Sequence, residues 1–171
     1  TRGTDHPAAK RALTPEVLVI ADAERPVAVA GVMGGMDSAV TAATRNVLLE
    51  AALFDPGAVR RSARLLKLAT DSSYRFERGV DPEGVVRARD LAVAAVLKEA
   101  GGEAGPSIEI GAAPSRPAPF VLRQARLSGL LGMEVPPLEV SRILRGLGCE
   151  ATEVPEGWRI QAPSRRGRDL R

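Results

Sequence analysis

Two Asp-Pro dipeptides, at residues 55–56 and 81–82, do most to limit how this chain can fold. Aspartate suits the residue before a helix because its side chain accepts a hydrogen bond from a free backbone N–H, and proline suits the first helical position. Apolar residues recur at helical spacing after Pro56, and a longer helix is predicted over residues 82–100, where Gly101 and Gly102 end it. The chain is therefore predicted to build its fold from helices as well as strands.

Short runs of β-branched and apolar residues predict the strands. Val17–Ile20 and Val27–Val32 are predicted as two strands, and the glycines at 31, 34 and 35 as a tight turn after them. Asn46–Phe54 is predicted as a third strand, and its nearly continuous apolar character predicts cover on both faces.

A proline-rich stretch at residues 103–119 predicts a domain boundary, which divides the chain into residues 1–112 and 113–171. Beyond it we expect a strand at 120–122, helices at 124–131 and 138–147, and a strand at 158–162. The predicted fold class is α+β or mixed α/β, with a mixed sheet and flanking helices followed by a small, mostly helical domain with short strands.

Composition excludes several classes of protein. Hydrophobic residues make up 44% of the chain and aromatic residues only 3%, so the core must consist mainly of aliphatic side chains. The one cysteine, Cys149, excludes an internal disulfide and a zinc site built from several cysteines. Apolar runs are far shorter than the ~20 residues of a membrane span, no signal peptide is visible, and a cytoplasmic location without membrane contact is expected.

The net charge of +3 is weak evidence for a nucleic-acid partner, but the basic residues cluster. One cluster is Arg60, Arg61, Arg64 and Lys67, and the other is Arg165, Arg166, Arg168 and Arg171. Arginine binds phosphate oxygens in pairs through its planar fork. Genome composition alone would explain the arginine content equally well.

Glu50 is the most informative polar residue because it interrupts an apolar run. A carboxylate there is costly unless it is paired, hydrogen-bonded or open to a cavity. One interpretation is an acceptor that lines a pocket, and the other is a salt bridge or the exposed face of an edge strand.

Other motifs carry less information. The turn that contains Gly34 lacks the lysine and hydroxyl residue of a phosphate-binding loop. The hydroxyl residues at 70–73 fit either a helix cap or the floor of a pocket. The charged residues Arg75, Glu77 and Arg78 fit either a structural ion-pair network or a phosphate contact. His6 is the only histidine, so no Ser-His-Asp triad can be argued, and we expect it to be solvated.

Several strings resemble the editing domain of the bacterial phenylalanyl-tRNA synthetase β subunit. They are Gly31-Val-Met-Gly-Gly35, Ser38-Ala-Val-Thr41, Asn46-Val-Leu-Leu-Glu50-Ala-Ala, Phe54-Asp-Pro56 and Thr70-Asp-Ser-Ser-Tyr-Arg-Phe-Glu-Arg-Gly-Val-Asp-Pro82. Residues 120–171 resemble, more loosely, the small nucleic-acid-binding-like domain that follows it. The resemblance implies an internal piece of that subunit, with residues 1–112 as the C-terminal part of the editing domain.

The resemblance also implies partners and chemistry. The family enzyme is a cytoplasmic α₂β₂ heterotetramer that charges phenylalanine-specific tRNA with the help of ATP and Mg²⁺. The aminoacylation chemistry lies in the α subunit, and the editing domain of the β subunit hydrolyses mischarged Tyr-tRNA. A second site that hydrogen-bonds the hydroxyl adds discrimination, because a hydrophobic pocket rejects an added hydroxyl only weakly.

The family pattern assigns roles to four residues of an editing pocket. Glu50 falls on the acceptor of the tyrosine hydroxyl, Gly34 on the glycine wall and Thr70 on a pocket threonine. Ser72 stands where the pattern has alanine, which predicts a tighter or more polar pocket. No residue is assigned as catalytic, because the editing histidine of the family lies upstream and His6 does not match it. Hydrolysis is then expected to use a water held by backbone groups and the tRNA terminus, with little or no activity in this chain alone.

The resemblance further implies a Mg²⁺ ligand at Asp169, although the stretch that leads to it is one residue longer than in the family. Two alternatives stay open. One is a non-catalytic RNA-binding or scaffold module of the same subunit. The other is an unrelated α/β binding domain, in which Glu50 would lie on an exposed surface without a cavity.

Overall fold

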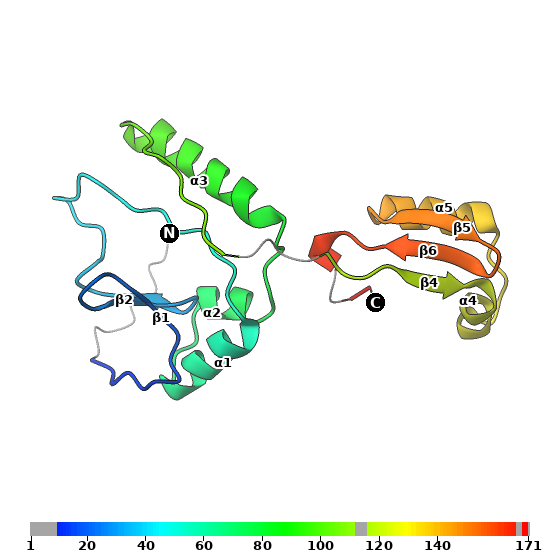
Figure 1. Cartoon of the computed structure of the whole chain (residues 1–171), viewed down its shortest axis with the longest axis horizontal. Helices are drawn as coiled ribbons and strands as arrows, with labels where there is room; N and C mark the ends of the chain where they lie inside the picture. Colours follow the sequence, from blue (N-terminus) through cyan, green and yellow to red (C-terminus); the bar gives the residue numbers. More distant parts are fainter. Residues whose placement is uncertain (1–9, 112–115, 167–168, 171) are drawn as a thin grey trace. The chain divides into compact units, whose positions relative to one another are not determined.

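The computed structural model describes residues 10–111, 116–166 and 169–170. The chain divides into two compact units, each with its own sheet and helices (Figure 1). The first comprises residues 1–80 and 85–102, and the second comprises 81–84 and 103–171. His6 and the predicted boundary at 112–113 lie outside the described residues.

The first unit contains a small antiparallel sheet in the order β1-β2-β3. β1 is Val19–Ala21, β2 is Pro26–Val29 and β3 is Met33–Gly34. Asp22 caps the β1–β2 turn, since its Oδ1 accepts hydrogen bonds of 2.8 Å from the backbone N–H groups of Glu24 and Arg25. Short turns of this kind join antiparallel neighbours, so the sheet is antiparallel rather than mixed as predicted.

Three helices follow the sheet. α1 is Pro56–Leu65, α2 is Asp71–Phe76 and α3 is Gly84–Ala100. The predicted start of α1 is confirmed, because the Asp55 carboxylate accepts a hydrogen bond of 2.7 Å from the Ala58 N–H and Pro56 opens the helix.

The core of the first unit lies between α1 and the turn before β3. Val59 is fully buried and packs with Val32 and Ala63. The rings of Phe54 and Phe76 cover this cluster, with their centroids 5.0 Å apart and their planes tilted by 54°. This core fixes the position of α1 relative to the turn.

The predicted third strand is wrong, since residues 46–54 contain no strand. Leu48 is 98% exposed, and Val47, Leu49 and Leu53 are exposed as well. An apolar segment becomes a strand only when a neighbour accepts and donates its ladder hydrogen bonds. Among the described residues β1 and β3 pair only with β2, so residues 46–54 have no ladder partner.

The second unit places two helices against an antiparallel sheet in the order β4-β6-β5. β4 is Phe120–Arg123, α4 is Gln124–Leu131, α5 is Pro137–Gly146, β5 is Glu150–Val154 and β6 is Gly157–Gln161, followed by a short 3₁₀ turn at Ser164–Arg166. Trp158 and Ile160 project from β6 into one core with Val140, Leu144 and Cys149. Both helices, β4 and β6 agree with the prediction to within one or two residues, whereas β5 was not predicted.

Candidate functional site

Thr70 and Ser72 are tied to the glycine turn by hydrogen bonds. The Thr70 hydroxyl donates to the carbonyl oxygen of Val32 at 2.7 Å, and the Ser72 hydroxyl donates to that of Gly31 at 3.0 Å. Thr70 also caps α2 in a capping box with Ser73, in which each side chain accepts a hydrogen bond of 3.0 Å from the backbone N–H of the other. The sequence-predicted pair therefore lies against the bare backbone of the turn.

These contacts limit what the two hydroxyls can offer a ligand. Each hydroxyl has one donor and two acceptor positions. Both donors are used on the turn, and one acceptor of Thr70 is used by Ser73. Thr70 and Ser72 can therefore accept a hydrogen bond from a water or an amino group, but donating one would require breaking a bond to the turn.

The turn itself requires glycine at position 31. Gly31 has a φ of 67°, and a Cβ added there would lie 3.0–3.2 Å from side-chain atoms of Val59, Phe54 and Phe76. Gly34, three residues further along in β3, is exposed, and a Cβ there would meet nothing within 4 Å. Gly34 thus borders open space, whereas Gly31 closes against the core.

Glu50, unlike Thr70 and Ser72, is not hydrogen-bonded to the turn. Its side chain makes no hydrogen bond or ion pair with any residue that the structure describes, and the residue is exposed. Partial burial of the carboxyl nevertheless raises the pKa of Glu50 above its ordinary value. Glu50 as a whole is exposed, but its carboxyl group is incompletely hydrated. The folded chain therefore favours the protonated form of this carboxyl more than the unfolded chain does.

A pH dependence follows from this shift. The raised pKa means that the folded chain holds the Glu50 proton more tightly, so this contribution to stability is complete below the unfolded pKa and is lost as pH rises through the folded one. The ordinary pKa of glutamate is about 4.3. As pH rises above that value, we expect the unfolding free energy of Glu50→Gln to fall less than that of the unchanged chain. Urea unfolding at a series of pH values measures it, with exposed Glu24→Gln as the control; an unchanged slope in Glu50→Gln would contradict the shift.

A recess of about 490 Å³ lies elsewhere on the first unit. Its lining residues are Pro15, Glu16, Val17, Leu18, Val19, Ala58 and Arg61. None of Gly34, Glu50, Thr70 or Ser72 lines it. The recess joins the edge of β1 to α1, and a hydrogen bond of 3.0 Å from the Leu18 N–H to the Ser62 hydroxyl holds the two together.

Asp169 is engaged by an arginine. Its Oδ2 accepts hydrogen bonds from Nε and Nη2 of Arg166 at 3.0 and 2.8 Å, and this pairing lowers the pKa of Asp169. No group of three metal-ligating side chains occurs in residues 10–111, 116–166 and 169–170. Mg²⁺ is commonly held by only one or two carboxylates with water, so the Mg²⁺ ligand that the resemblance implies at Asp169 stays a prediction.

Comparison with known proteins defines the class. Residues 5–101 match the B3/4 domain family, so the chain belongs to that family.

The chain is also similar to β subunits of phenylalanine–tRNA ligase. It is 47% identical over 156 residues to that of Xanthomonas oryzae pv. oryzae, 45% over 156 residues to that of Xylella fastidiosa, and 44% over 154 residues to that of Nitrosococcus oceani. These alignments cover 90, 90 and 89% of this chain and 20, 20 and 19% of the relatives. The chain thus spans about a fifth of the length of the curated relatives it matches.

The resemblance inferred from the motifs is thereby confirmed. The helices that the structure describes include none with the length and apolar character needed to cross a membrane.

Proposed function

We propose that this chain is part of the β subunit of a phenylalanine–tRNA ligase and contributes to hydrolytic editing of mischarged Tyr-tRNA. The similarity to the ligase β subunits, at 44–47% identity over nine-tenths of the chain, carries the proposal. The whole enzyme would then charge phenylalanine-specific tRNA in the cytoplasm, using ATP and Mg²⁺, as an α₂β₂ assembly with the chemistry of charging in the α subunit.

Glu50 supplies the proposed discrimination. An incompletely hydrated carboxylate gains from a hydrogen bond donated by the tyrosine hydroxyl, whereas phenylalanine would leave it without one. Gly34 would border the ring, because apart from its chain neighbours nothing lies within 4 Å of the place that a Cβ would take. Thr70 and Ser72 would accept hydrogen bonds from the amino group or from a water, since their own protons are held by the turn.

The test uses the full subunit that carries this sequence, assembled with its α subunit. We expect Glu50→Ala to reduce the preference for deacylating Tyr-tRNA over Phe-tRNA by about 10- to 100-fold, the value of a hydrogen bond to a charged group. Deacylation of the two substrates is measured separately, and Glu24→Ala serves as a control because Glu24 is also exposed on the first unit. A preference that survives Glu50→Ala would refute the role of Glu50.

A second candidate is a non-catalytic RNA-binding or scaffold module of the same subunit. The exposure of Glu50 outside any strand favours it. It predicts salt-dependent binding of tRNA without hydrolysis. Binding that does not change between low and high salt would argue against this candidate.

A further inference from the structure

The side of α1 that faces away from the core is formed by arginines. At about 100° per residue, the buried residues Val59, Ser62 and Ala63 lie on one side of the helix. Arg60, Arg61 and Arg64 lie on the other, and all three are exposed. We call these three residues the α1 arginine face.

Among the described residues, the α1 arginine face is not paired with carboxylates by ion pairs. α1 itself contains no acidic residue. None of the three arginines forms an ion pair with a carboxylate in the described part of the chain; Arg60 instead donates from Nη2 to the backbone carbonyl of Glu77 at 3.2 Å. The nearest acid along the chain, Asp55, accepts a hydrogen bond as the N-cap and forms no ion pair with these arginines in the described residues.

Structural roles account for only part of this charge. Arg64 lies in the last turn, where a cation interacts favourably with the helix dipole. Arg60 and Arg61 lie nearer the middle of the helix, where that interaction is weak. Like charges this close repel one another, so an external anion would stabilise the three arginines.

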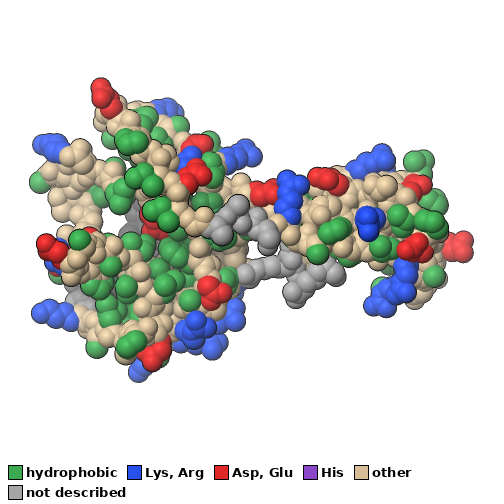
Figure 2. Space-filling model, in the orientation of Figure 1, with side chains coloured by type: hydrophobic (Ala, Val, Ile, Leu, Met, Phe, Trp, Pro, Cys, Tyr) green, Lys and Arg blue, Asp and Glu red, His purple; other side chains and the backbone are tan. Residues whose placement is uncertain are grey.

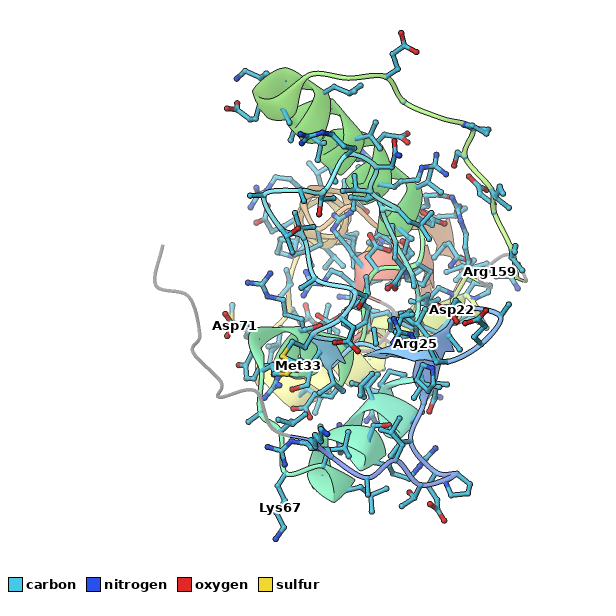
Figure 3. All side chains as sticks on the ribbon, turned by 90° about the vertical axis from the view of Figure 1, so that its left-hand side faces the viewer. Asp22, Arg25, Met33, Lys67, Asp71 and Arg159 are labelled. Carbon is cyan, nitrogen blue, oxygen red and sulfur yellow. The ribbon has the colours of Figure 1, made fainter. Side chains whose placement is uncertain are left out.

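The basic surface extends beyond the helix. Lys67 follows α1 in a left-handed conformation with a φ of 52° and is exposed; in Figure 3 it points away from the unit. Figure 2 shows Lys and Arg side chains gathered at the lower end of the first unit, with a few acidic ones among them. Glu16 is one nearby acid, because it lines the same recess as Arg61.

We propose that the α1 arginine face, extended by Lys67, binds the phosphate backbone of RNA. Three guanidinium groups within two helical turns match a linear anion better than a single small one, since each can bind phosphate oxygens through two N–H groups. The choice of RNA as the anion rests on the proposed role in a tRNA ligase. The surface itself does not depend on the editing pocket.

The experiment measures binding of an uncharged tRNA transcript by fluorescence anisotropy over a series of salt concentrations. The variant is Arg60→Gln/Arg61→Gln/Arg64→Gln, because glutamine has nearly the same helix propensity as arginine. Loss of three phosphate contacts should raise Kd on the order of 100-fold at physiological salt and reduce the slope of log K against log salt by roughly 2–3.

A matched control removes the same charge elsewhere. Arg126→Gln/Arg145→Gln/Arg159→Gln changes three exposed arginines of the second unit, and these form no ion pair in the described residues. We expect it to keep most of the affinity and slope. Equal losses in both triple variants would show an effect of net charge alone and overturn the proposal.

Two further outcomes also decide. If the α1 variant loses amide-exchange protection at Val59, the single changes Arg60→Gln and Arg61→Gln replace it, each with an expected slope loss of about 1. Folded variants with an unchanged Kd and slope for tRNA would overturn the proposal. So would variants that lose binding to phosphatidylserine vesicles but keep their binding to tRNA. Because the tRNA is uncharged, failure here leaves the editing proposal intact, and failure of the Glu50→Ala test leaves this one intact.

Discussion

Gly31→Ala is expected to lower the unfolding free energy of the first unit by about 2–5 kcal/mol. A left-handed conformation costs a residue with a Cβ about 1–2 kcal/mol, and Gly31 has a φ of 67°. The added methyl would also press on Val59, Phe54 and Phe76 at 3.0–3.2 Å, which is overpacking worth about 1–3 kcal/mol. These side chains belong to the core or cover it, so the neighbours have little room to move.

Amide exchange at Val59 and Ala63, both in the buried side of α1, measures this change in the first unit separately from the second. Gly34→Ala is the matched control, since its Cβ would meet nothing within 4 Å, and we expect a change within about 0.5 kcal/mol. Similar losses of unfolding free energy for Gly31→Ala and Gly34→Ala would contradict the prediction. They would mean that the close contacts around Gly31 do not destabilise the Gly31→Ala variant. In the full ligase the same control also tests whether bulk at Gly34 hinders hydrolysis of Tyr-tRNA.

Trp158→Ala is expected to destabilise the second unit by about 3–5 kcal/mol, the usual cost of removing a large buried aromatic side chain. Trp158 is 2% exposed and lies in the same core cluster as Ile160, Val140 and Leu144. Its indole Nε1 donates to the Ser141 hydroxyl at 3.0 Å, so the substitution removes a buried hydrogen bond as well. The sheet and α5 would lose the side chain that joins them.

Thermal unfolding followed by NMR of the second unit checks this prediction, because the substitution removes the only tryptophan and with it the fluorescence signal. Trp158→Phe helps to separate the two contributions, since it keeps most of the apolar side chain but removes the hydrogen bond, which is worth about 1 kcal/mol. Leu138→Ala is the control, because Leu138 is 83% exposed. A loss for Trp158→Ala no larger than for Leu138→Ala would contradict the assigned core.

The helices were predictable because their signals are local. Asp55 and Pro56 mark the start of α1 through contacts within one turn. The segment at 124–131 was predicted with the boundaries that α4 has. Such features need no knowledge of the rest of the fold.

The strands were less predictable because pairing is not local. Residues 46–54 have a strand-like composition, yet in the described residues no neighbour completes their ladder. The reverse holds for β5, whose sequence Glu150–Val154 is polar but which pairs with β6 across the turn at Pro155 and Glu156. The Pro-Glu-Gly sequence was the available signal for that hairpin.

The candidate site divides in the same way. Thr70 as a helix cap could be read from its position before α2, whereas its hydrogen bond to Val32, 38 residues away, depends on the tertiary fold. The family motifs named Glu50, and its exposure and raised pKa could only come from the structure.

The buried Cys149 can be used to measure how often the second unit opens. It is the only thiol in the chain and is 5% exposed within the core of the second unit. An alkylating reagent can therefore reach it only when that core opens. The rate of labelling then reports how often the core of the second unit opens, and it needs no introduced probe.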